Sequence, residues 1–220
     1  MKSMSYEAVM ARKNEIMQSS IGLDFSIYES GGIAFDYERL MEDVGLTLEE
    51  VLAIQLEMGV GNTPLRELKN VTALARKLAP AGKGARILVK DEANNLSGSF
   101  KARRAAISVW DAKRKGYKGV IAATSGNYGA AVAALANRLG LKALIIQECY
   151  DSKMIGQPEI LEKQRACEAY GAEVMQLTVG PELFYEHLRL LEETGFYNAS
   201  LYTPYAIAGI ETLGYEIAQQ

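Results

Sequence analysis

Short apolar runs alternate with longer helix-forming segments over most of the chain after residue 86. Four of the runs are predicted strands: 87–90, 120–123, 143–147 and 173–178. Each precedes a predicted helix, and these helices span 101–115, 129–139, 158–169 and 181–194. A glycine follows each helix closely, as a left-handed C-cap does: Gly116, Gly140, Gly171 and Gly195. This alternation predicts an α/β fold of parallel strands with helices on both faces of the sheet.

Composition and charge exclude several classes of function. A net charge of −3 gives no reason to expect nucleic acid or an anionic membrane as a partner. No window approaches the roughly 20 apolar residues of a membrane span. The single histidine, His187, lies in a predicted helix, so we expect a structural role for it and no metal site. Cys149 and Cys167 are predicted to be reduced thiols of a cytoplasmic protein.

A loop of small residues at 95–100 follows the predicted strand 87–90, and Lys101 opens the next helix. Helix N-termini carry unpaired N–H groups and a partial positive charge, which attract phosphate groups. A lysine at this place suits chemistry on a phosphorylated ligand. The alternative is a solvated lysine beside Arg103 and Arg104 on a basic helix face.

A second loop, Thr-Ser-Gly-Asn-Tyr-Gly at 124–129, follows the strand 120–123 and opens another helix. Ligands of parallel α/β sheets bind beyond the carboxyl ends of the strands. We therefore expect Lys101 and Asn127 to share one crevice. The two loops together supply two neighbouring N–H-rich helix starts.

The runs Ser-Gly-Ser-Phe-Lys at 97–101 and Ser-Gly-Asn-Tyr-Gly at 125–129 resemble those of fold type II pyridoxal-phosphate enzymes. This family includes threonine synthase, serine and threonine dehydratases, cysteine synthase and the tryptophan synthase β chain. Further motifs occur in the order of the family, at 61–65, 90–92, 170–174 and 209–212. The resemblance implies a two-domain α/β fold that binds pyridoxal 5'-phosphate.

The resemblance also implies roles for single residues. Lys101 is the catalytic amine that condenses with the cofactor aldehyde and later serves as general acid and base. Asn127 hydrogen-bonds the hydroxyl of the cofactor ring. Ser99 is a helper near the lysine, although a helix N-cap is an equally good interpretation of it. The carboxylate of an amino-acid substrate is bound by the second loop, through Thr124, Ser125, Gly126 and Asn127.

One feature departs from the family pattern. The glycine-rich phosphate loop of the family and the partner of the ring nitrogen lie downstream of the small domain, and this sequence ends at Gln220 without them. The glycines at 59–61 and 82–84 are poor substitutes. We therefore expect the 220 residues to be the N-terminal portion of a longer enzyme, inactive alone.

The resemblance predicts a division of the chain into parts. Residues 1–57 form a helical N-terminal extension, in which Thr47 and Glu50 have the form of a capping box at the start of a helix 48–58. Residues 58–108 begin the large cofactor domain. Residues 109–205 form the small α/β domain, and 206–220 return to the large one.

Alanine and arginine follow Lys101, where threonine synthases usually have aspartate. With the N-terminal extension, this run most resembles the larger, cofactor-binding subunits of 2-amino-4-ketopentanoate thiolases. That resemblance implies cleavage of 2-amino-4-ketopentanoate with coenzyme A into acetyl-CoA and alanine, in ornithine degradation. It further implies a small second subunit and a homodimer or hetero-oligomer.

Two alternatives stay open. One is β- or γ-elimination or replacement on the same fold, as in threonine synthase, a dehydratase or a diaminopropionate lyase. The other is a non-catalytic subunit or inactive fragment. The lack of a phosphate loop favours the second alternative, whereas Lys101 and Asn127 speak against it.

Overall fold

The computed structural model of the protein describes residues 3–31, 34–124, 126–150, 153, 155–178, 181–200 and 202–220. Its helices are α1 (Tyr6–Ala11), α2 (Lys13–Ile21), α3 (Tyr37–Val44), α4 (Leu48–Glu57), α5 (Lys69–Leu78), α6 (Lys101–Arg114), α7 (Asn127–Arg138), α8 (Pro158–Ala169), α9 (Pro181–Thr194) and α10 (Pro204–Gln219). Its strands are β1 (Glu29–Ser30), β2 (Ala34–Phe35), β3 (Leu65–Glu67), β4 (Leu88–Lys90), β5 (Gly119–Ala123), β6 (Lys142–Glu148), β7 (Glu173–Leu177) and β8 (Tyr197–Asn198). Within these ranges no helix is long and apolar enough to cross a membrane.

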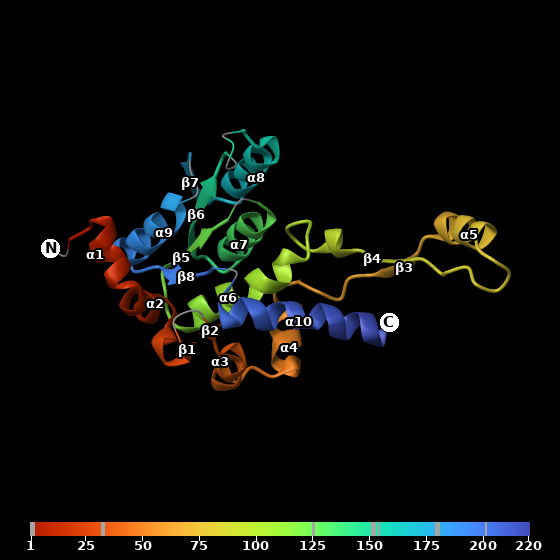
Figure 1. Ribbon diagram of the computed structural model, residues 1–220, viewed down its shortest axis with the longest axis horizontal. Coiled ribbons are helices and arrows are strands. Elements are labelled where there is room, and N and C mark those ends of the chain that lie inside the picture. The colour runs from red at the N-terminus through yellow and green to blue at the C-terminus, as the bar shows by residue number, and fades with distance from the viewer. Residues whose placement is uncertain are drawn as a thin grey trace.

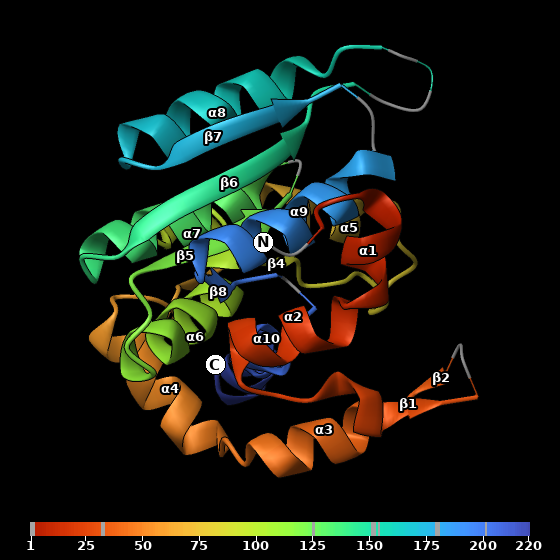
Figure 2. The same cartoon turned by 90° about the vertical axis from the view of Figure 1, so that its left-hand side faces the viewer.

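A four-stranded parallel sheet of order β7-β6-β5-β8 lies at the centre of the fold. Helices α7 and α8 pack on one face with α6 beside them, and α9 packs on the other face beneath α1 and α2 (Figure 2). Successive residues of β5 belong to different apolar clusters, because side chains alternate across a strand. Val120 and Ala122 pack on the α7 side, whereas Ile121 packs on the α9 side. The predicted parallel sheet with helices on both faces is confirmed.

Two strands differ from the prediction. The run at 87–90 does not join the parallel sheet: β4 pairs antiparallel with β3. Together with α5 these strands form an arm that projects from the rest of the chain, at the right of Figure 1. The neighbour of β5 at the edge of the parallel sheet is instead β8, where the sequence predicted no strand. Hydrophobic patterns show that a strand exists, but its partner depends on residues distant in sequence.

Most helix ends follow the local signals. Thr47 and Glu50 form the predicted capping box, with the side chain of each accepting a hydrogen bond from the backbone N–H of the other. The four predicted C-cap glycines have φ values of 81°, 67°, 85° and 64°, which glycine adopts without strain. The predicted helical N-terminal extension begins with two short helices, α1 and α2, separated at Arg12. The division into domains stays a prediction.

The guanidinium of Arg103, in the first turn of α6, is completely buried and joins several segments. On one side it donates two hydrogen bonds to Glu92, at 2.8 and 2.9 Å. On the other it donates two to Glu216 of α10, both at 2.8 Å. Lys90 adds a bond of 2.7 Å to Glu216. Bidentate hydrogen bonds between a guanidinium and a carboxylate fix orientation as well as distance. Arg103 therefore holds the start of α6 to α10 and to the segment after β4.

Uncharged groups complete this Arg103 cluster. The hydroxyls of Thr63 and Thr212 accept from the guanidinium. The amide of Gln55, in α4, donates to the carbonyls of Arg103 and Gly209 at 3.0 and 2.6 Å. A Cβ at Gly209 would lie 2.3 Å from the Arg103 carbonyl, so only glycine allows α10 to approach α6 this closely. The motifs at 61–65, 90–92 and 209–212 thus meet at Arg103, and the solvated basic face considered for this residue is wrong.

We expect Arg103→Met to lower the free energy of unfolding by about 3–5 kcal/mol, because it leaves Glu92 without its cation and Glu216 with Lys90 alone. Urea denaturation followed by circular dichroism measures the change. The matched control is Arg165→Met on α8, an exposed residue, whose effect should stay within about 0.5 kcal/mol. A loss below about 1 kcal/mol for Arg103→Met would contradict the role of the cluster.

The cluster also predicts how stability depends on pH. Burial by itself raises the pKa of Glu216, but the hydrogen bonds from Arg103 and Lys90 outweigh it and lower the pKa to about 2. A depressed carboxyl pKa stabilises the folded state above the unfolded value, and this stabilisation disappears as the pH falls. Between about pH 5 and pH 2, wild type should therefore lose stability more steeply than Glu216→Gln. Unfolding measured across this range tests the slope, with the exposed Glu211→Gln as a control that keeps the wild-type profile.

Candidate functional site

Lys101 is the first residue of α6, at the end of the loop that the sequence singled out. Gly98, with φ of 71°, allows a turn in which its N–H donates to the carbonyl of Asn95 at 2.8 Å. The side chain of Asn95 in turn accepts from the Gly61 N–H at 2.9 Å. The amine of Lys101 lies 5.0 Å from the centre of the Phe100 ring and makes no hydrogen bond or ion pair with any described residue. The amine therefore lies beside the Phe100 ring of the loop and has no polar partner among the described residues.

Ser97 and Ser99 precede this lysine in the sequence. Their hydroxyls are buried, and neither has a hydrogen-bond partner among the described residues. The N-cap of α6 is Phe100, and no described side chain caps this end of the helix. The alternative interpretation of Ser99 as an N-cap is therefore wrong. Buried hydroxyls normally have partners, so these two and the uncapped N–H groups offer polar contacts to a ligand. Ser97 was missed at the sequence level because nothing there shows that its hydroxyl is buried.

The second loop continues directly from β5. The Thr124 N–H donates to the carbonyl of Ile146 at 2.8 Å, and the Thr124 hydroxyl accepts from the Gly126 N–H at 3.3 Å. Gly126 is the N-cap of α7, no described side chain caps that helix, and no described atom lies within 4 Å of the place of a Cβ. Asn127 is the first residue of α7 and is half-buried. Ser125 lies outside the described residues.

The two candidate loops stand at the starts of α6 and α7. The two helices lie against each other, α6 ends just before β5 begins, and α7 starts just after β5 ends. Helix α7 therefore begins at the carboxyl end of the sheet. The hydroxyl of Tyr170, which lies between the end of α8 and the start of β7, donates to the carbonyl of Leu96 at 3.4 Å, so this contact of the lysine loop lies toward the amino end of the sheet. A crevice shared by Lys101 and Asn127, and the roles assigned to these residues, stay predictions.

A cavity of about 510 Å³ lies on the other face of the sheet, under the N-terminal helices. Its wall comes from α1, α2, α9 and the ends of β5, β6 and β8. Most of the lining is apolar: Met10, Met17, Ala123, Leu183, Phe184, Leu188 and Tyr202. The polar lining residues are Lys13, Thr124, Glu148, His187, Asn198 and Ser200. Of the predicted site residues, Thr124 borders this cavity. The sequence treats 1–57 as an extension and does not reveal the cavity.

His187 in the wall of this cavity is buried and neutral. Burial lowers its pKa to about 4, against the smaller opposing effect of the hydrogen bond to Asn198. Its Nε2 lies 3.0 Å from Oδ1 of Asn198, which also accepts from the Ser200 N–H. Because an amide oxygen only accepts, we assign the imidazole proton to Nε2. The Nδ1 atom is then an acceptor, and it is buried without a partner among the described residues.

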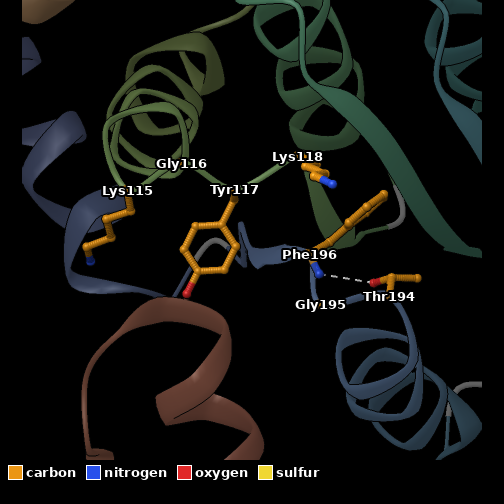
Figure 3. Close-up of a pocket in the computed structure, with 7 residues that line it drawn as sticks. All are labelled: Lys115, Gly116, Tyr117, Lys118, Thr194, Gly195 and Phe196. Atoms are coloured by element: carbon orange, nitrogen blue, oxygen red, sulfur yellow. Dashed lines mark hydrogen bonds between the residues drawn. The ribbon is translucent and has the colours of Figure 1, made fainter.

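Another cavity, of about 560 Å³, lies at the amino end of the sheet and is shown in Figure 3. It is lined by the turn before β5 and the turn before β8, at Lys115, Gly116, Tyr117, Lys118, Thr194, Gly195 and Phe196. The amine of Lys115 already pairs with Asp111 at 2.8 Å and donates to the Ile21 carbonyl at 2.7 Å. This cavity is at the opposite end of the sheet from the loop at 124–129, and we assign no chemistry to it.

The groups at the starts of α6 and α7 fit a phosphorylated aldehyde cofactor better than a metal ion. Among the described residues they comprise an unengaged amine, two unpartnered hydroxyls, an amide and two uncapped helix N-termini, all suited to an anion or a carbonyl group. Metal ions prefer clustered histidine, cysteine or carboxylate ligands. Within the part of the chain that the structure describes, no such cluster is found.

Comparisons with known proteins agree with this chemistry. The family model described as "Pyridoxal-phosphate dependent enzyme" matches residues 56–220. The 2-amino-4-ketopentanoate thiolase beta subunit of Acetoanaerobium sticklandii is 67% identical over 217 residues, which cover 99% of this chain and 46% of that protein. The chain thus spans about half the length of the curated relatives it matches.

Solved structures show the same fold. A threonine deaminase from T.th. has a TM-score of 0.63 and 31% identity, over 80% of this chain and 52% of that one. Maize serine racemase has a TM-score of 0.65 and 26% identity, over 79% of this chain and 48% of that one. The predicted fold type II resemblance is confirmed. The chain belongs to the pyridoxal-phosphate dependent enzymes, and its cofactor is pyridoxal 5'-phosphate.

Proposed function

We propose that this chain is the cofactor-binding part of an enzyme that cleaves 2-amino-4-ketopentanoate with coenzyme A, giving acetyl-CoA and alanine. One observation carries the proposal: the 67% identity to the thiolase beta subunit extends over 99% of the chain. It therefore includes the N-terminal residues that the general family model, which begins at residue 56, does not match.

The reaction needs an acyl transfer from carbon to sulfur. The thiol sulfur forms a bond to the keto carbon, and the bond between this carbon and the adjacent CH₂ breaks. The thiol proton is balanced by a proton that the CH₂ carbon gains when it becomes the methyl group of alanine. Bound pyridoxal phosphate supplies an electron sink for the charge on the amino-acid fragment.

Lys101 is proposed as the residue that binds the cofactor aldehyde and moves the proton. Its amine makes no hydrogen bond or ion pair with a described residue, and the Arg103 cluster holds its helix two residues further on. A positioned base or acid of this kind contributes about 10²–10⁴-fold in rate. Ser97 and Ser99 are proposed to donate hydrogen bonds near the amine, because their buried hydroxyls have no partner among the described residues.

The loop at 124–127 is proposed to bind the substrate carboxylate. The N–H groups at the uncapped start of α7 and the Thr124 hydroxyl offer donors, and the open space at Gly126 leaves room for a bound group. Ser125 belongs to this proposal by resemblance alone. The amide of Asn127 is proposed to orient the cofactor by a hydrogen bond to its ring hydroxyl.

We further propose the other parts of the assembly that the resemblance implies: a small second subunit, a homodimer or hetero-oligomer, and a cytoplasmic location. The name of the relative as a beta subunit supports the second subunit. Both cysteines are free, as a reducing compartment requires. Elimination or replacement at an amino acid is the second candidate reaction, favoured by the likeness to threonine deaminase.

We expect borohydride reduction of the protein with pyridoxal phosphate to leave a stable adduct on Lys101, located by peptide mass mapping. Lys101→Ala should lose this adduct and, in the complete enzyme, lower kcat by about 10²–10⁴-fold or more. The matched control is Lys113→Ala on the exposed side of the same helix. This variant should keep the adduct on Lys101 and the wild-type kcat. An adduct that persists in Lys101→Ala would show that another amine binds the cofactor.

Product analysis separates the two candidate reactions. With 2-amino-4-ketopentanoate and coenzyme A, thiolysis consumes one free thiol for each alanine formed, because sulfur takes the acetyl group. Elimination instead releases ammonia or phosphate from its own substrates and leaves the thiol unchanged. From the complete enzyme we expect equal amounts of acetyl-CoA and alanine, measured by chromatography and a thiol assay. Ammonia release with no loss of thiol would favour the second candidate.

A further inference from the structure

We propose that the cavity under α1 and α2 binds the thiol-bearing arm of coenzyme A, an extended chain with two amide groups that ends in a thiol. The inference rests on the proposed thiolysis and names where its second substrate binds. Its four supports are the origin of the cavity wall, its size and polarity, the unpartnered acceptor of His187, and the position of Thr124.

The N-terminal segment builds one wall of the cavity. Met10 comes from α1, and Lys13 and Met17 come from α2. These helices pack on α9 and precede residue 56, where the match to the general family begins. The thiolase beta subunit of A. sticklandii, in contrast, aligns with 99% of the chain. The residues of this wall lie outside the part of the chain that matches the general family. They therefore suit the binding of a substrate that most enzymes of the family do not use.

The size and lining of the cavity suit such a ligand. Its volume of about 510 Å³ falls within the roughly 300–1,000 Å³ of small-molecule sites. Methionine side chains adapt to ligands of irregular shape, and two of them, Met10 and Met17, line this cavity. A few polar groups among apolar ones match an arm that has methylene and methyl groups between its amides.

His187 offers a specific contact. Its Nδ1 is a hydrogen-bond acceptor because the Nε2 proton is directed at Asn198. This acceptor is buried and unpartnered among the described residues, which is unfavourable in a folded protein. An amide N–H or the thiol S–H of the arm would supply the missing donor. The imidazole stays neutral at physiological pH, since burial lowers its pKa to about 4, and so it stays an acceptor.

Thr124 connects the cavity to the proposed site of reaction. It borders the cavity and also begins the loop in which the Gly126 N–H donates to its hydroxyl. That loop is proposed to hold the carboxylate of the amino-acid substrate. A thiol at this end of the cavity therefore approaches the substrate from the α9 side of the sheet.

Isothermal titration calorimetry of the holoprotein with coenzyme A tests the proposal. Leu183→Trp fills the cavity from α9, and Met10→Trp fills it from α1. We expect each to raise the Kd for coenzyme A at least about tenfold, since tenfold corresponds to the loss of a modest contact. The matched control, Leu161→Trp on α8, changes an exposed leucine and should leave the Kd unchanged. Thermal unfolding of each variant verifies that it is folded.

The outcomes separate this inference from the proposed function. An unchanged Kd in both filled variants overturns the binding site, while acetyl-CoA formation by wild type would leave the thiolase function standing. Absence of coenzyme A binding to wild type overturns the site as well, and absence of acetyl-CoA then also overturns the function. If one filled variant is unfolded, the other decides the question.

Discussion

The buried guanidinium of Arg103 is the interaction on which the arrangement around α6 depends. Its charge is removed from water, which is costly, and four hydrogen bonds to Glu92 and Glu216 offset that cost. Such a cluster adds little net stability over an apolar core, but it tolerates only one relative placement of its members. Because those members come from the segment after β4, from α6 and from α10, the cluster sets where α6 begins and hence where Lys101 lies.

Several residues of the family-like motifs serve packing rather than chemistry. Gly209 allows α10 to approach the backbone of Arg103. At Gly129, a Cβ would lie 2.8 Å from Ile145 and from Thr124, so glycine is required for α7 to lie on the sheet. These contacts fix how α10 lies against α6 and how α7 lies on the sheet. Residues that never touch a ligand thus determine where the reactive groups can be, which explains why the motifs combine glycines with polar side chains.

Periodicity and caps predicted the parts of the fold that depend on local interactions: the helices α4 and α6 to α9, the capping box at Thr47 and the C-cap glycines. They did not predict that β4 pairs with β3 or that β8 closes the sheet, because pairing is decided by distant residues. The same holds at the site. Lys101 and the loop at 124–127 carry recognisable motifs, whereas burial of Arg103 depends on Glu216, which is 113 residues away. The cavity likewise exists only once α1 and α2 pack on α9.

Thr124 shows how the two faces of the sheet can be coupled. On the α7 side its methyl group packs at the place where Gly129 lacks a side chain, and its hydroxyl accepts from the start of the next helix. On the α9 side it borders the cavity under the N-terminal helices. A residue just after the end of a strand can contact the helices on both faces of the sheet, because the alternation of side chains between the two faces ends with the strand. A ligand on either side of the sheet would therefore contact the same backbone turn, and any coupling between two such ligands would be reciprocal.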